Sequence, residues 1–157
     1  MANKRVRTLL LTGLLMVGLV GGALPASATN IGNEGCTPGY WKNHTDNWEE
    51  YSPSTTLGSV FTLPAYASSL ADDTFAEALS YGGGSTLLAK AKTLLHHAVA
   101  AVLNAAHEGV GYPYRRFSDP GQIVASTNNA LASQDAATML ALKDKWDTAN
   151  NLGCPLN

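Results

Sequence analysis

Apolar residues recur at helical spacing from Ser85 to about His107, in the longest periodic segment of the chain. At about 100° per residue, one broad arc is apolar and the opposite stripe is polar. The arc holds Leu87, Leu88, Ala91, Leu94, Leu95, Ala98, Val99, Val102, Ala105 and Ala106, and the stripe holds Lys90, Thr93, His97, Asn104 and Glu108. With Ser85 as N-cap and Gly109 and Gly111 as stop signals, the pattern predicts a central core helix. Its many alanines indicate close contact with neighbouring helices.

Capping signals predict two shorter helices on either side of this segment. Thr74 and Glu77 stand at capping-box spacing, which predicts a short helix over residues 75–79. Ser118-Asp119-Pro120 is typical of a helix start with proline in the first turn, and the helix is expected to run to about Ala132.

A last helix restarts at Ser133 to Asp135 and stops near Gly153. One of its sides is expected to be buried and carries Met139, Leu142, Trp146 and Ala149. Three or more amphipathic helices with no repeat or linker indicate one compact core.

The segment before the central helix lacks a long periodic pattern. Pro-Gly at 38–39 predicts a turn, and Thr45 or Asp46 can cap a short helix through Tyr51. Residues 57–63 are apolar but too brief to predict a strand. The predicted fold is therefore all-α, a small single-domain helical bundle with a long central helix and an irregular N-terminal segment.

The N-terminus has the order of features that a secretory signal peptide requires. Lys4, Arg5 and Arg7 precede an apolar run at 9–20, and the small-residue sequence Ala26-Ser27-Ala28 follows. We expect residues 1–28 to be cleaved and 29–157 to form one secreted, extracellular domain. No second run of about 20 apolar residues follows, so no membrane anchor is expected after cleavage.

Cleavage would make the chain acidic. Three of the ten Lys and Arg residues leave with the signal peptide and all twelve acidic residues stay, which gives 7 − 12 = −5. An acidic chain with no basic cluster beyond Arg115-Arg116 lacks the cationic surface that binds phosphate backbones. Nucleic acid is therefore not expected as a partner.

The chain has two cysteines, Cys36 and Cys154, one near each end of the predicted mature domain. Exported chains meet an oxidising compartment, where such pairs persist as disulfides. We predict a disulfide that joins the two ends, and the chain-entropy model assigns about 4 to 5 kcal/mol to so long a loop. The alternative is a pair of metal ligands or reactive thiols.

The four histidines raise the question of a metal site. His96 and His97 are neighbours, and helical geometry points their rings about 100° apart. We expect His97 to be solvated on the polar stripe and His96 to lie at the edge of the core. The metal hypothesis instead joins His44, His96 and His107 through folding.

Catalytic signatures are missing from the sequence: it has no nucleophile elbow, HExxH, P-loop or dinucleotide fingerprint. Gly82-Gly83-Gly84 is interpreted as a helix stop. Glu49-Glu50 and Asp72-Asp73 are interpreted as solvated or capping carboxylates rather than a glycosidase pair. A small secreted hydrolase with His44 or His96 as general base remains an alternative.

The most unusual stretch lies beside the predicted disulfide, where four aromatic residues fall within a short segment. The candidate binding residues are Tyr40, Trp41, Lys42, Asn43, His44 and Trp48. Aromatic rings with amide neighbours can stack on sugars or contact another protein. The structural alternative is a hydrophobic plug that seals the end of the helical domain where the termini meet.

Residues 36–44 resemble the C-T-x-G-Y-W-K-N-H motif of a group of secreted and cell-surface bacterial proteins. Residues 78–84, 94–106 and 150–156 are also similar to members of that group, so the resemblance extends over most of the mature chain. It implies export and an extracellular role. It carries over no catalytic residue.

These observations favour a secreted, non-enzymatic binding or cell-surface-associated module without a cofactor. Its partner would be a cell-wall glycan or another surface protein. An extracellular metal-binding protein and a small secreted hydrolase are the alternative functions.

Overall fold

The computed structural model describes residues 32–115 and 120–156, and within these ranges it is helical with no named strand. Residues 1–28, the predicted signal peptide, and Ser118 and Asp119, a predicted helix start, lie outside the described residues. In chain order the elements are α1 (Pro38–Asn43), η1 (Thr45–Asn47), α2 (Leu57–Val60), η2 (Ala65–Leu70), α3 (Phe75–Ala78), α4 (Leu87–Ala106), α5 (Gly121–Ala132) and α6 (Ala136–Asn150). The predicted all-α fold is confirmed.

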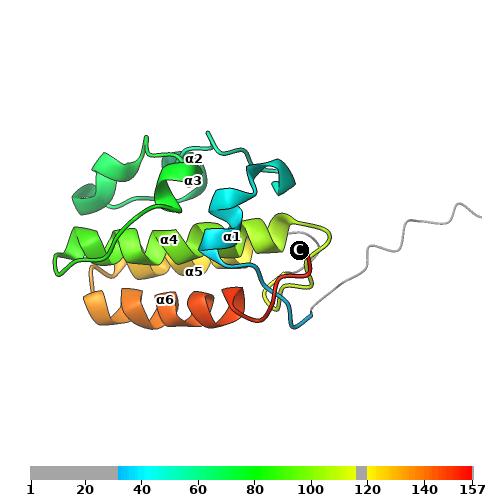
Figure 1. The fold of residues 1–157 in the computed structure, drawn as a ribbon. Helices are drawn as coiled ribbons and strands as arrows, with labels where there is room; N and C mark the ends of the chain where they lie inside the picture. The colour runs from blue at the N-terminus through cyan, green and yellow to red at the C-terminus, as the bar shows by residue number, and fades with distance from the viewer. Residues whose placement is uncertain (1–31, 116–119, 157) are drawn as a thin grey trace, which may run out of the picture.

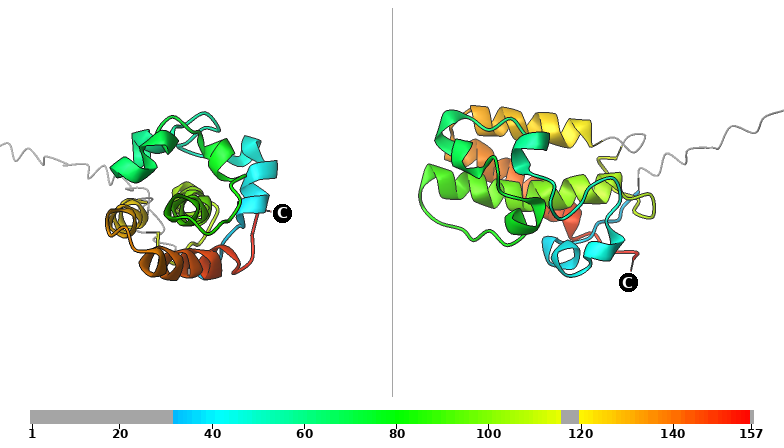
Figure 2. Two further views of the ribbon diagram at one scale, coloured as in Figure 1. Left: turned by 90° about the vertical axis from the view of Figure 1, so that its left-hand side faces the viewer. Right: turned by 90° about the horizontal axis from the view of Figure 1, so that it is seen from above.

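The predicted long central helix is α4, and the other elements surround it. Helices α5 and α6 pack along one side of α4, while α1, η2 and α3 cover the opposite side (Figure 1). Seen end-on, α4 is enclosed by these two layers (Figure 2). The core therefore surrounds α4 and does not lie between two equal layers of helices.

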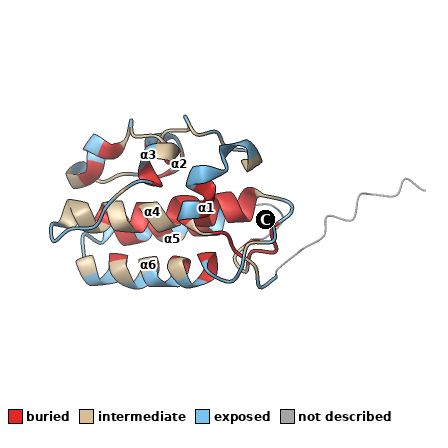
Figure 3. Cartoon of the chain, in the orientation of Figure 1, coloured by how far each residue is buried: buried red, intermediate tan, exposed pale blue. Residues whose placement is uncertain are grey.

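Burial around α4 corrects the predicted polar stripe. Every residue from Ala98 to Ala106 is buried, including Asn104, which is fully buried (Figure 3). His97, predicted to be solvated, keeps only 15% of its side chain exposed. A helix that is apolar on nearly all sides lies inside a protein. Here α6 covers the polar stripe at His97, through Asp147 and Asn150, and α6 and Cys36 together cover it at Asn104.

The helix caps agree with the sequence at most positions. Thr86, not the predicted Ser85, caps α4 by accepting a hydrogen bond from the backbone N–H of Ala89 at 3.1 Å. The predicted capping box of Thr74 and Glu77 forms at the start of α3. Adjacent serine and threonine are both good caps, so sequence alone leaves an uncertainty of one residue.

Helices α5 and α6 begin and end near the predicted residues. Helix α5 begins just after Pro120, and Asp135 caps α6 by accepting from the backbone N–H of Thr138 at 2.8 Å. The predicted buried side of α6 contains Met139, Trp146 and Ala149, which are buried, and Leu142, which is half-buried. The last turn is followed by Gly153 at φ +114°, a backbone conformation that glycine adopts without strain.

The predicted turn at Pro38-Gly39 is wrong, because these residues form the first turn of α1. Thr37 caps this helix by accepting from the backbone N–H of Tyr40 at 3.1 Å. The helix expected to start at Thr45 or Asp46 is only the short 3-10 turn η1. Proline suits the first turn of a helix as well as a β-turn, so the Pro-Gly pair is ambiguous until its N-cap is known.

Across residues 32–115 and 120–156, no helix combines the length and the apolar character needed to cross a membrane.

Candidate binding site

The predicted disulfide between Cys36 and Cys154 is present and joins the two ends of the described chain, with 4.4 Å between the two Cα atoms. Beside it, Gly35 and Gly153 form an isolated antiparallel bridge, and the Gly35 N–H donates to the Gly153 carbonyl at 3.0 Å. A Cβ atom at position 35 would collide with the carbonyl of Ala149, so the close crossing requires glycine.

A buried amide fixes this end of the molecule to α4. The side chain of Asn104 accepts from the Cys36 N–H at 2.7 Å and donates to the Cys36 carbonyl at 2.8 Å. One side chain thus satisfies both backbone groups of a fully buried residue, as a neighbouring strand would. We call this pair of hydrogen bonds the Asn104 clamp.

The clamp continues into α6 through Asn150, which is also fully buried. Its Oδ1 accepts from Asn104 Nδ2 at 3.0 Å and from the Tyr112 hydroxyl at 2.8 Å, and its Nδ2 donates to the His97 carbonyl at 3.0 Å. Burial raises the pKa of Tyr112, so its hydroxyl stays protonated and able to donate. Sequence reasoning missed both asparagines as anchors, although a lone asparagine among alanines and leucines was a usable signal.

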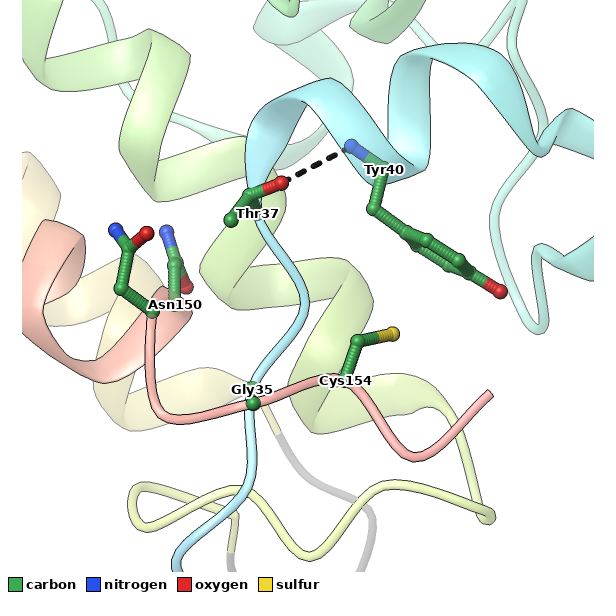
Figure 4. Close-up of a pocket in the computed structure, with 7 residues that line it drawn as sticks. Gly35, Thr37, Tyr40, Asn150 and Cys154 are labelled. Atoms are coloured by element: carbon green, nitrogen blue, oxygen red, sulfur yellow. Dashed lines mark hydrogen bonds between the residues drawn. The ribbon is translucent and has the colours of Figure 1, made fainter. Parts of the chain in front are cut away.

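A cleft of about 240 Å³ opens where the two chain ends cross, next to the disulfide (Figure 4). Its described lining consists of Gly35, Thr37, Tyr40, Asn150, Asn151, Gly153 and Cys154. These residues contribute hydroxyl, amide, aromatic and backbone groups, and none of their side chains is charged. The described walls of the cleft are thus partly polar and partly apolar, and they carry no charge.

Tyr40 forms one wall and is held on several sides. Its ring stacks on His44, with 4.2 Å between ring centroids and 12° between planes, and meets Trp41 edge-on at 5.3 Å. Its hydroxyl accepts from Asn47 Nδ2 at 2.6 Å and donates to the Leu156 carbonyl at 3.3 Å. Tyr40 therefore ties α1 to the C-terminal segment and leaves only 9% of its own surface exposed.

The structure divides the six candidate binding residues into three that are exposed and three, Tyr40 among them, that are buried or half-buried. Lys42, Asn43 and His44 are exposed at the end of α1. Trp41 is fully buried, and Trp48 is half-buried with its indole N–H donating to the Trp41 carbonyl at 3.0 Å. The tryptophans lie as the hydrophobic-plug alternative describes.

His107 braces the plug. Its ring lies 5.8 Å from that of Trp41, and its Nδ1 accepts from the Gly109 N–H at 2.9 Å. Its Nε2 is 3.5 Å from Glu49, whose other oxygen accepts from the Glu108 N–H at 2.7 Å. Glu49 and His107 therefore hold the segment after η1 against the end of α4.

The three histidines of the metal hypothesis lie in separate surroundings. His44 stacks on Tyr40, His96 Nδ1 lies 3.2 Å from the Ala78 carbonyl, and His107 faces Glu49. Among the residues that the structure describes, no three His, Cys, Asp or Glu side chains gather closely enough to hold a metal ion.

His96 and His97 belong to α4, and their side chains face its neighbours: His96 faces Ala78 at the end of α3, and His97 faces Asp147 in α6. Burial lowers the pKa of His96, and burial outweighs the attraction of Asp147 and lowers the pKa of His97 to about 4. His97 Nδ1 is 3.6 Å from the Asp147 carboxylate and has no hydrogen-bond partner within the described residues. At neutral pH the fold therefore holds His97 as an uncharged group.

The candidate carboxylate pairs have structural contacts instead of facing each other across a site. Asp73 accepts a hydrogen bond from the Tyr81 hydroxyl, and its backbone carbonyl accepts from the Leu57 N–H. Glu49 binds the Glu108 N–H as described above, and Glu50 is exposed.

No protein-family model, curated protein or solved structure matches the chain. Of the features described above, the neutral cleft at the disulfide end is the one that is open to a ligand and built from side chains that are held in place.

Proposed function

We propose that the chain is a secreted, non-enzymatic binding module whose ligand site is the cleft at the disulfide end. The observation that carries this proposal is the cleft itself, an uncharged and partly polar space of about 240 Å³ beside the disulfide that joins the two ends of the domain. Thr37 and Tyr40 line the cleft, so the start of α1 forms one of its walls. The exposed residues Lys42, Asn43 and His44 follow at the other end of the same short helix. A ligand longer than the cleft could contact them.

The chemistry of the lining favours a neutral, hydroxyl-rich ligand, of which a cell-wall saccharide is our choice. A charged ligand would lose hydration without meeting an opposite charge on the described walls, and an apolar one would leave amides and hydroxyls without partners. Hydroxyl groups can both donate to Asn151 Oδ1 and accept from the Thr37 hydroxyl. Both residues line the cleft.

The site is preorganised, which supports binding. The disulfide, the Gly35–Gly153 bridge and the Asn104 clamp hold the walls before a ligand arrives. Ordering a flexible wall on binding would cost free energy, and a fixed wall avoids that cost. Metal binding and hydrolysis, the two alternative functions raised by the sequence, have no comparable support among the described residues.

An NMR titration with neutral chitooligosaccharides tests the proposal, with an acidic oligogalacturonate as the comparison ligand. We expect the neutral ligand to shift the amide signals of Gly35, Tyr40 and Gly153, and the acidic one to leave them unchanged. Asn151→Ala should weaken binding by about 3- to 10-fold, the value of one neutral hydrogen bond. Asn129→Ala, an exposed asparagine on α5, is the matched control and should bind as the parent does.

Two results would count against the proposal. Neutral saccharides that leave every cleft signal unmoved would remove the ligand class, and shifts confined to another face would remove the cleft. Shifts limited to Lys42, Asn43 and His44 would instead move the site to the outer side of α1.

A further inference from the structure

The two cysteines of the disulfide differ in how far they are buried. Cys36 is fully buried, whereas Cys154 is half-buried and lines the cleft. Figure 4 shows the Cys154 side chain directed into the space beside Tyr40. A reagent that enters the cleft therefore meets Cys154 first.

The backbone attachments are also unequal. On the N-terminal side, the Asn104 clamp holds both backbone groups of Cys36, and the backbone N–H and the carboxylate of Glu34 both bind Gly111. Trp41, five residues after Cys36, is locked in the core. Breaking the disulfide would leave all of these contacts in place.

The C-terminal side has fewer attachments. Beyond Asn150, the described tail is held by the disulfide, the hydrogen bond from Gly35 to Gly153, the hydrogen bond from Tyr40 to Leu156 at 3.3 Å and the packing of half-buried Leu156 against the core. Leu152 is the most exposed large apolar residue among those described. Segments with few buried contacts open at the lowest free-energy cost.

We propose that Cys154 is a site of thiol–disulfide exchange, at which a small thiol opens the disulfide and frees residues 151–156 while Cys36 stays anchored. The attacking thiolate forms a new S–S bond with Cys154 Sγ, and the bond to Cys36 breaks. The electron pair passes to Cys36 Sγ, which then takes up a proton. The small thiol is oxidised into the mixed disulfide, and Cys36 is reduced to a thiol.

Reduced glutathione, added to the folded oxidised protein without denaturant, is the probe. The reaction is quenched with acid, and after unfolding and alkylation the cysteine peptides are analysed by mass spectrometry. We expect about tenfold or more glutathione adduct on Cys154 relative to Cys36, because access decides which sulfur is attacked. Equal adducts on both cysteines would overturn the proposal.

A paired substitution tests the route of attack. Asn151 lines the cleft and is exposed, so Asn151→Trp should shield Cys154 and slow adduct formation several-fold. Asn129→Trp places the same ring on the exposed side of α5 and should leave the rate unchanged. Equal rates in the two variants would mean that the thiol does not enter through the cleft.

Hydrogen exchange of the isolated Cys154 adduct tests which segment is released. Amide exchange should accelerate within residues 151–156 and stay slow at Cys36 and Trp41. Simultaneous loss of protection at Cys36 and through α1 would show that the whole end of the domain opens, which contradicts the proposal.

Discussion

Replacing Asn104 by alanine removes the one side chain that satisfies both backbone groups of Cys36. The Cys36 N–H and carbonyl lose partners at 2.7 and 2.8 Å, and Asn150 Oδ1 loses one of its two donors. Tyr112 still donates to Asn150, so that amide keeps a partner. The new alanine leaves a space that is sealed from water, because Asn104 and Cys36 are fully buried.

The expected loss of unfolding free energy follows from the two Cys36 backbone groups that are left without a partner. Leaving a buried donor or acceptor unsatisfied costs about 1 to 3 kcal/mol each, so the variant should lose about 2 to 6 kcal/mol of unfolding free energy. A domain of this size has about 5 to 15 kcal/mol in total. The loss is thus a large fraction of the whole, although the disulfide keeps the chain ends close together.

Urea unfolding, followed by tryptophan fluorescence at constant disulfide state, measures this loss. Asn129→Ala, which removes an exposed asparagine from α5, is the control and should change the free energy by less than about 0.5 kcal/mol. A loss below about 1 kcal/mol for Asn104→Ala would refute the reasoning. It would mean that water or a backbone shift satisfies Cys36 without the amide.

Three further predictions concern the core, pH and processing. Trp41→Ala should lose about 3 to 5 kcal/mol by the same assay, because a fully buried indole is removed; an unchanged midpoint would show that the ring is not a core element. The folded pKa of His97, about 4, lies below the unfolded value of about 6.5, so the unfolded chain binds more protons between these pH values. Unfolding free energy should therefore fall by roughly 2 kcal/mol from pH 6.5 to 4, less than the full shift because the ring keeps some solvent contact, and this fall should be smaller in His97→Gln. Intact mass spectrometry of protein from a producer's culture medium should show a chain that begins at Thr29, whereas an uncleaved N-terminus would contradict the signal-peptide prediction.

Local signals in the sequence predicted most of the helical fold. The 3.6-residue period identified α4, the capping-box spacing of Thr74 and Glu77 identified the start of α3, and the restart predicted at residues 133–135 placed the start of α6. The pairing of Cys36 with Cys154 was predicted because the chain has only two cysteines and an N-terminus that predicts export. The helix predictions depend on residues that are near one another in the sequence, and two cysteines can form only one disulfide.

The errors share a long-range cause. Asn104 and His97 were assigned to water because an amphipathic pattern has one polar side, but α6 packs on that side of α4 and Cys36 covers Asn104 as well. The cleft could not be predicted either, since it forms where Gly35 crosses Gly153. Such contacts depend on how the two ends meet, and no local pattern contains that information.

Helical geometry explains why one short segment supplies both the plug and the exposed polar residues. Thr37, Tyr40 and His44 are spaced by three and four residues, so they follow one side of α1 beside the C-terminal segment. Trp41 faces the core, while Lys42 and Asn43 face water. An aromatic-rich sequence suggests stacking on sugars, but here the rings pack against one another.

This arrangement limits how tightly the cleft can bind. His44 already stacks on Tyr40, Trp41 is buried and Trp48 is half-buried against it, so none of these aromatic rings is left free to stack on a sugar here. Recognition of a saccharide must therefore rely mainly on neutral hydrogen bonds. Three or four such bonds at about 1 kcal/mol each give roughly 3 to 4 kcal/mol, which corresponds to a Kd of about 1 mM or weaker for one site. Weak single sites become useful when many copies meet a polymeric ligand, since linked sites raise the effective concentration. The expected behaviour is therefore undetectable capture of short oligosaccharides on a column, measurable NMR shifts at millimolar ligand, and firm retention on the intact polymer by protein displayed in many copies.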